Sequence, residues 1–201
     1  DVTDGLINFI GNVGTASNSS INVTGCQARS LRGDGFSQVS GAGNAGRINY
    51  TNCNTINCGS SSTGSHQGWT AHQPGQSAVL TNCTSTDDRE AISFVGGSTG
   101  TWVSGTITDS LATCVKADSG STVNIESGVT VNCGGGGNLL DCSTSSAINF
   151  NGATVNITNT DTSFVRSGAT LTINGGNWLV NAALQARIEC LGGGTVLATG
   201  N

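Results

Sequence analysis

One five-residue pattern recurs along the chain: apolar, polar, apolar, polar, then Gly, Asn or Ser. The first copy reads INVTG at residues 21–25. Alternation with a period of two is typical of a β-strand with one buried face, and a final residue that tolerates positive φ suits a bend. With some substitutions, the copies lie at 21–25, 48–52, 78–82, 101–105, 123–127, 148–152, 171–175 and 196–200.

Successive copies begin 27, 30, 23, 22, 25, 23 and 25 residues apart, and each interval contains further short apolar segments such as 114–117 and 129–131. About three short strands per repeat, stacked on their neighbours, describe a parallel β-helix, because a single coil cannot bury its own apolar side. Parallel crossovers are nearly always right-handed. The sequence therefore predicts an all-β, right-handed parallel β-helix solenoid of about seven to eight coils of 22–30 residues, forming one domain over residues 1–201.

The register also predicts which side chains share a column. The first and third residues of each copy form two inward columns, and the second and fourth residues point outward. In the copy at 101–105 this register places Thr101 and Val103 inward. It places Trp102 outward, where the indole is a candidate stacking platform or interchain contact.

Composition changes the expected exterior and partners. Gly, Asn, Thr and Ser make up 102 of the 201 residues, whereas charged residues are 9%, against about 25% in typical domains. The exterior must therefore present hydroxyls and amides. A net charge of −5 with seven Lys plus Arg gives no basic footprint, so no nucleic-acid partner is expected. No apolar run of 18 residues occurs, so no membrane span is expected.

The eight cysteines admit two interpretations. Cys26, Cys53 and Cys83 occupy the same position on three successive coils, which favours buried thiols on a coil-to-coil ladder. The alternatives are a Cys53–Cys83 pair or local Cys53–Cys58 and Cys133–Cys142 bridges. The chain has no CxxC and only two histidines, so neither a metal nor a cofactor is expected.

The two longest intervals place extra chain between about residues 34 and 77, and these coils hold the densest polar chemistry. The register stacks segments 34–39, 66–72 and 87–90 at one corner, one coil spacing of about 4.8 Å apart. Carbohydrate hydrolysis uses pairs of carboxyl groups, one as acid and one as base or nucleophile. The candidate catalytic residues are Asp34, Asp87, Asp88 and Glu90, and the candidate binding residues are His66, Trp69, His72, Arg89 and Trp102.

Asp87 and Asp88 are adjacent and should point to opposite sides of a strand. A working pair would therefore combine carboxylates from different coils, such as Asp34 with Asp87 or Glu90. The alternative is structural, because acidic residues at turns commonly cap backbone amides, and a tryptophan such as Trp69 is more often a core residue than a sugar platform.

Four segments resemble coils of the right-handed parallel β-helix, pectin-lyase-like superfamily, as seen in phage tail spikes and secreted polysaccharide-active proteins. They read DGFS at 34–37, INYTNC at 48–53, AVLTNC at 78–83 and DDREAIS at 87–93. The resemblance implies a protein of the extracellular space or virion surface that binds polysaccharide and, as a glycoside hydrolase or polysaccharide lyase, cleaves it. It also implies trimeric self-association. The Gly-His-Gly and Arg-Ile-Lys motifs of polygalacturonases are absent, so enzymatic activity is left open.

A second hypothesis is a non-catalytic filament subunit or adhesin stalk that assembles by end-to-end stacking. The low charge, the Thr/Asn exterior and the lack of an obvious polar cap after the last copy favour it. Ice binding by the Thr/Asn columns is a third, weaker hypothesis, because Val79, Trp102 and Glu126 interrupt the columns.

Overall fold

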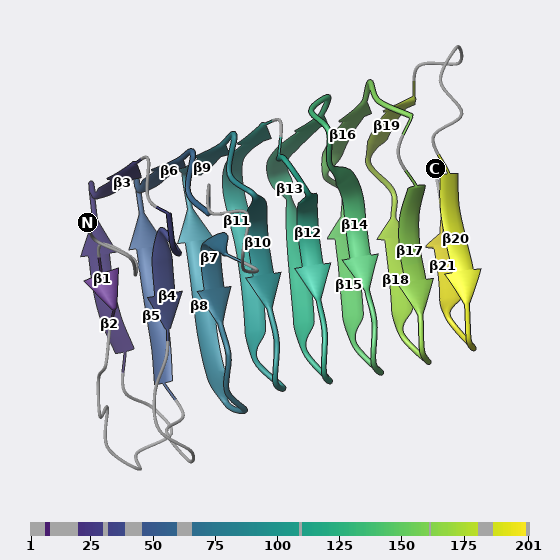
Figure 1. The fold of residues 1–201 in the computed structure, drawn as a ribbon, viewed down its shortest axis with the longest axis horizontal. Helices are drawn as coiled ribbons and strands as arrows, with labels where there is room; N and C mark the ends of the chain where they lie inside the picture. The colour runs from purple at the N-terminus through teal and green to yellow at the C-terminus, as the bar shows by residue number, and fades with distance from the viewer. Residues whose placement is uncertain are drawn as a thin grey trace.

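A computed structural model of the chain is a parallel β-solenoid whose coils stack along one axis (Figure 1). It describes residues 7–8, 20–29, 32–38, 46–59, 66–108, 110–160, 162–180 and 187–199. These residues form strands, turns and bends without a helix, so they include no helix capable of crossing a membrane. Part of the predicted extra chain, at 39–45 and 60–65, lies outside the described residues.

Eight strands form one wall, sheet A, and each pairs in parallel with the strand one coil before and after it. In spatial order they are β1 (Ile7–Asn8), β4 (Phe36–Gln38), β7 (Gln67–Ala71), β10 (Glu90–Phe94), β12 (Thr113–Ala117), β14 (Asn138–Cys142), β17 (Thr162–Arg166) and β20 (Arg187–Leu191).

Sheet B forms the opposite wall and continues around a bend into a third wall. Its main strands are β2 (Ser20–Thr24), β5 (Gly46–Thr51), β8 (Gln76–Thr81), β11 (Thr99–Thr108), β13 (Thr122–Cys133), β15 (Ala147–Asn151), β18 (Thr170–Asn174) and β21 (Thr195–Thr199). The third wall contains β3 (Gln27–Arg29), β6 (Asn54–Ile56), β9 (Cys83–Thr86), β16 (Thr154–Ile157), β19 (Asn177–Val180) and the final residues of β11 and β13.

The chain rises through sheet B, crosses the third wall and descends through sheet A while advancing from N to C, which is a right-handed path (Figure 1). The predicted all-β parallel β-helix is confirmed. Gly25, Asn52 and Asn82 adopt positive φ of 68°, 54° and 52° at the bend after sheet B. Gly and Asn tolerate this conformation, which explains why they recur at this position.

The lumen columns follow the predicted register in seven of the eight copies, and the copy at 101–105 is the exception. Trp102, not Val103, pairs with Leu80 and Ile125, and Gly100 pairs with Ala78 and Val123. Trp102 is fully buried, whereas Val103 is 38% exposed. The prediction of an outward Trp102 and an inward Thr101 and Val103 is therefore wrong by one residue.

Gly100 explains this shift physically. A Cβ at this position would lie 2.5 Å from Cε2 of Phe94, so the Phe94 ring occupies the space that Ile48 or Val123 fills on other coils. A glycine at the first lumen position carries no hydrophobic signal. The neighbouring segment TWVSG, at residues 101–105, was therefore aligned with the repeat one residue out of register.

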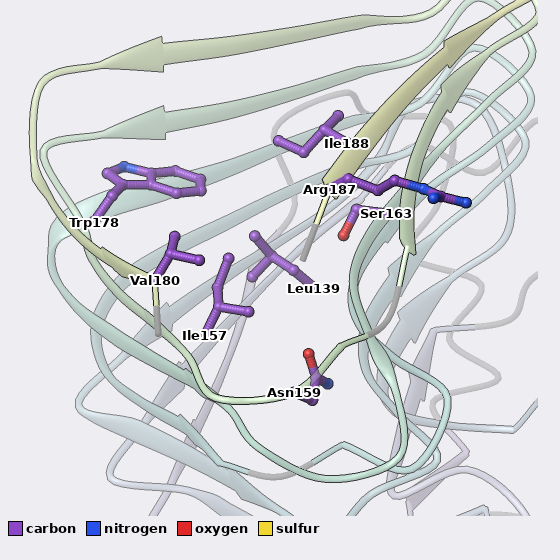
Figure 2. Close-up of a pocket in the computed structure, with 8 residues that line it drawn as sticks. All are labelled: Leu139, Ile157, Asn159, Ser163, Trp178, Val180, Arg187 and Ile188. Carbon is purple, nitrogen blue, oxygen red and sulfur yellow. The ribbon is translucent and has the colours of Figure 1, made fainter. Parts of the chain in front are cut away.

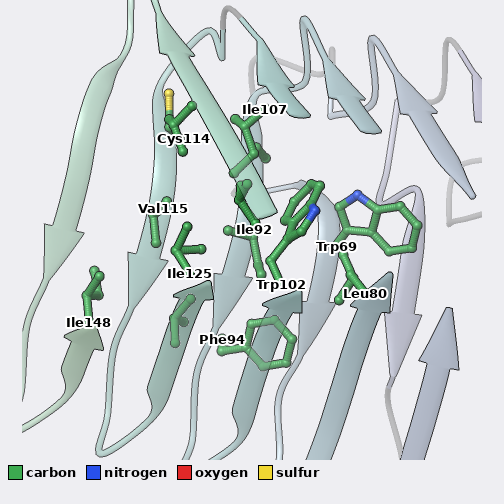
Figure 3. Packing of buried hydrophobic residues seen from close by; sticks show 14 of the residues in the cluster. Trp69, Leu80, Ile92, Phe94, Trp102, Ile107, Cys114, Val115, Ile125 and Ile148 are labelled. Atoms are coloured by element: carbon green, nitrogen blue, oxygen red, sulfur yellow. The ribbon is translucent and has the colours of Figure 1, made fainter. Parts of the chain in front are cut away.

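Aromatic side chains fill the lumen at the second to fourth coils (Figure 3). The Trp69 ring stacks on Phe36 with centroids 4.5 Å apart and an interplanar angle of 17°. Tyr50 and Trp102 meet Trp69 edge-on, with centroids 4.9 Å and 6.2 Å away. Offset stacking and edge-to-face contacts are the favoured aromatic geometries, so this cluster anchors the coils that carry the candidate site.

Asn side chains on the outer face of sheet B bond to one another along the solenoid axis. Asn49 donates to Asn22 and Asn149 donates to Asn124, each at 2.9 Å. These ladders connect successive coils outside the lumen and confirm the predicted outward columns of amides.

All eight cysteines are described, and none of them forms a disulfide. Cys53, Cys83, Cys114 and Cys142 are fully buried, whereas Cys190 is exposed. The thiol interpretation is confirmed, and the three alternative bridges considered from the sequence are not formed.

Candidate functional site

Asp34 and Glu90 lie in one column on the outer face of sheet A, with Gln67 between them. Glu90 pairs with Gln67 across the sheet, and Phe36 pairs with Trp69, which places Asp34 level with Gln67. The Gln67 backbone N–H donates to Asp34 Oδ1 at 2.9 Å, and Gln67 Nε2 donates to Glu90 Oε2 at 3.0 Å. Gln67 thus joins two carboxylates from coils on either side of it.

Basic groups complete this arrangement at both ends. Lys116 Nζ lies 2.9 Å from Glu90 Oε1, and His66 Nδ1 lies 3.6 Å from Asp34 Oδ1. The Asp34 side chain is 18% exposed and that of Glu90 is 8% exposed. We name these five residues, His66, Asp34, Gln67, Glu90 and Lys116, the polar row.

The two carboxylates are separated along the solenoid axis. Asp34 and Glu90 are two coils apart, which is about 10 Å at the usual strand spacing. Carboxyl pairs that activate a water in inverting glycoside hydrolysis are about 6.5–9.5 Å apart. Two coil spacings therefore lie slightly beyond that range, and the Gln67 side chain, which donates to Glu90, lies between the two carboxylates.

A second polar column runs beside the first and contains Ser37, Thr70, Ser93 and Lys116. Thr70 Oγ1 and His72 Nε2 are hydrogen-bonded at 3.0 Å. Burial lowers the pKa of His72 below its ordinary 6.5, although the negative charges of Asp34 and Glu90 act to raise it. His72 is therefore a neutral hydrogen-bonding group at neutral pH, and its side-chain contact is with Thr70 of the second polar column.

Asp88 points into the solenoid instead of toward the polar row. Its side chain is fully buried and accepts hydrogen bonds from the Thr55 and Ser85 hydroxyls and, at 2.8 Å, from the Cys58 backbone N–H. Desolvation raises its pKa, although these hydrogen bonds oppose the shift. Asp88 is enclosed by three donors and cannot reach a ligand outside, so its predicted catalytic role is not supported by its position.

Asp87 and Arg89 flank Asp88 at the turn before β10. Asp87 is exposed, adopts φ of 53° and donates its backbone N–H to Thr108 O. Asn57 holds the equivalent place one coil earlier, also with φ of 53°. Arg89 is half-buried, and its backbone bonds to Cys58 and Ala112. Both residues are explained by turn geometry, so the carboxylate pair that shares a face is Asp34 with Glu90.

Neither predicted tryptophan platform is accessible. Trp69 is 1% exposed and belongs to the lumen aromatic cluster. Trp102 is also in the lumen, and its Nε1 donates to Ser104 O at 3.0 Å. Trp69 and Ala71 of β7, and Gly100 and Trp102 of β11, face the lumen, so both binding predictions are corrected to core roles.

Gln67 and Lys116 were missed as site residues, although the sequence contains the signal. Gln67 precedes Glu90 by 23 residues, which is one coil. Lys116 follows Glu90 by 26 residues, one coil plus three positions. Counting by coil length would have found Gln67, whereas Lys116 meets Glu90 because the two consecutive inward residues Ala91 and Ile92 bring Glu90 and Ser93, the partner of Lys116, to the same face.

A cavity of about 260 Å³ lies within the later coils, between β14 and β20 (Figure 2). Its apolar lining comes from Leu139, Ile157, Trp178, Val180 and Ile188. None of the predicted site residues lines it. The candidate site is therefore the polar row on sheet A, and not this cavity.

Among the described residues, no group of three or more His, Cys, Asp or Glu side chains is close enough to hold a metal ion. Comparison of this chain with family models, with curated proteins and with solved structures gave no match.

Proposed function

We propose that this protein is an extracellular or virion-surface β-solenoid that binds polysaccharide along the polar row. The observation that carries the proposal is the Asp34–Gln67–Glu90 column, in which two carboxylates and an amide from three successive coils are hydrogen-bonded in one row. Carboxylates and amides are hydrogen-bond partners for sugar hydroxyls. The resemblance of segments 34–37 and 87–93 to tail-spike and pectin-lyase-like coils favours the same ligand class.

Cleavage is the enzymatic form of this proposal. Glu90 is held by two donors, Lys116 and Gln67, whereas Asp34 is bonded to a backbone N–H and faces His66. Two carboxylates in different surroundings can take different roles, one protonating the leaving oxygen and the other activating water. Chain shortening of a bound polysaccharide is the readout that separates cleavage from binding alone.

The proposal is tested with a panel of capsular and O-antigen polysaccharides in affinity electrophoresis. The Asp34→Asn/Glu90→Gln double variant should bind the selected polysaccharide at least about tenfold more weakly, because hydrogen bonds to charged groups contribute about 1.5–3 kcal/mol each. Asp87→Asn is the matched control, since it removes one exposed carboxylate at a turn position that Asn also tolerates. Absence of binding across the panel, or equal weakening by Asp87→Asn, would contradict the proposal.

Self-association through strands β19 to β21 is a second candidate function. Leu179, Leu191 and Leu197 are 57%, 47% and 50% exposed there, one on each wall of the solenoid, and exposed apolar side chains at this end favour a protein partner. We expect sedimentation equilibrium to show oligomers that Leu179→Asn/Leu191→Asn dissociates. Leu111→Asn, which alters an exposed leucine of another region, should leave them intact. A monomer at all concentrations would exclude this function.

A further inference from the structure

A column of thiols runs along the solenoid at the bend between sheet B and the third wall. Cys26, Cys53 and Cys83 each follow a residue with positive φ. Each thiol donates to the carbonyl oxygen two residues earlier on its own coil, at 3.6, 3.4 and 3.5 Å. Since the three side chains have the same local geometry, their sulfur atoms are stacked along the solenoid axis.

Cys53 is the middle member and can reach a neighbour on either side. The Cys26 backbone N–H donates to Cys53 Sγ at 3.4 Å, and Cys53 Sγ also contacts Val23 O of the preceding coil at 3.6 Å. Neighbouring coils are separated by about 4.8 Å, within the 4.4–6.8 Å range of Cα separations in disulfides. Rotation of two side chains can therefore close a bridge between coils while the strands stay paired.

Solvent access to the thiols distinguishes the two possible bridges, Cys26–Cys53 and Cys53–Cys83. Cys53 and Cys83 are fully buried, whereas Cys26 is only partly buried. Desolvation raises the pKa of Cys53, and that of Cys83 to about 11, so little thiolate is available at these two buried positions. An oxidant in solution must therefore react first at Cys26, and the thiol next to it is Cys53.

We propose that Cys26 and Cys53 are a redox modification site that forms an inter-coil disulfide when the protein meets a small-molecule disulfide. The Cys26 thiolate attacks one sulfur of the oxidant, and a mixed disulfide forms as one thiol leaves. Cys53 then loses its proton and attacks Cys26 Sγ, and the second small thiol leaves. Two protein thiols are oxidised to one disulfide, while one oxidant molecule is reduced to two thiols.

The bridge would fix the first coil to the second. Solenoid coils contact only their neighbours, so an outer coil can open without the rest of the structure. A cross-link between residues 27 positions apart in sequence restricts that opening, because it limits the conformations available to the open state. The same disulfide would also hold the chain segment that leads to Asp34 in register with the segment that leads to Gln67.

The test uses oxidised glutathione as the probe on the Cys190→Ser protein, which removes the exposed cysteine that would form intermolecular bridges. After oxidation, alkylation of remaining thiols and proteolysis under non-reducing conditions, fragmentation mass spectrometry should identify a Cys26–Cys53 cross-link. The midpoint of thermal unfolding should rise by several degrees on oxidation. Neither change should occur in Cys26→Ser/Cys190→Ser.

Three outcomes would overturn the inference: glutathione attached to Cys26 without a cross-link, a Cys53–Cys83 bridge as the main product, or a cross-link that leaves the unfolding midpoint unchanged. The first two would show that Cys53 does not resolve the Cys26 adduct. The third would show that the first coil does not open before the protein unfolds.

Discussion

Replacing Trp69 by alanine is expected to lower the free energy of unfolding by about 3–5 kcal/mol, the usual cost of deleting a buried large aromatic side chain. Trp69 is 1% exposed and packs against Phe36, Tyr50 and Trp102. Its removal would leave a cavity within the lumen where three coils meet, and the paired strands around it limit collapse into it. Urea unfolding followed by circular dichroism measures the loss.

Trp178→Ala is the control for this result. Trp178 is half-buried, and its ring meets Phe150 edge-on with centroids 5.1 Å apart, so its replacement should cost clearly less than that of Trp69. If Trp69 were an exposed sugar platform, Trp69→Ala would abolish polysaccharide binding and change stability by less than about 0.5 kcal/mol. That outcome would contradict the lumen assignment.

Replacing Asp88 by alanine is expected to lower the free energy of unfolding by about 2–4 kcal/mol. The change removes the acceptor for the Cys58 backbone N–H and for the Thr55 and Ser85 hydroxyls. Each buried donor left without a partner costs about 1–3 kcal/mol, although a hydroxyl can turn to another acceptor. Asp87→Ala, at the neighbouring exposed position, should change the free energy of unfolding far less.

The difference in unfolding free energy between the wild type and Asp88→Ala should change with pH in one direction. Burial raises the pKa of Asp88 above its ordinary 3.8, so the native state favours the protonated carboxyl. The stabilisation from this shift is fully present below pH 3.8 and is lost as the pH rises through the raised native pKa. The stability difference between the wild type and Asp88→Ala should therefore be larger in acid than at neutral pH. A difference that grows with pH would show that Asp88 is stabilised as a carboxylate.

The coil architecture could be predicted because the lumen selects apolar side chains at alternate positions of every strand. Ile48, Val123, Ile148 and Leu171 carry this signal directly, and seven of eight sheet B strands were placed in the correct register. The register predicted for the sheet B strand of the fourth coil was wrong because Gly100 occupies a lumen position but has no apolar side chain. Its space is taken by Phe94 from the opposite sheet, a contact that local alternation cannot reveal.

The candidate site could be predicted only in part. Counting by coil length brought Asp34 and Glu90 to one face, and the structure places them in one column. The direction of Asp88 could not be predicted from neighbouring residues, because β10 has two consecutive inward residues, Ala91 and Ile92, both fully buried. At such a corner, alternation no longer determines which side of the wall a residue faces.

The most direct test of the account is a crystal structure of the protein bound to an oligosaccharide fragment of the polysaccharide selected in the binding panel. We expect the sugar to lie on the outer face of β4, β7, β10 and β12, with hydroxyl groups within hydrogen-bond distance of the Asp34 and Glu90 carboxylates. An oligosaccharide bound to the Asn ladders of sheet B or to the last coils, with the polar row empty, would contradict it.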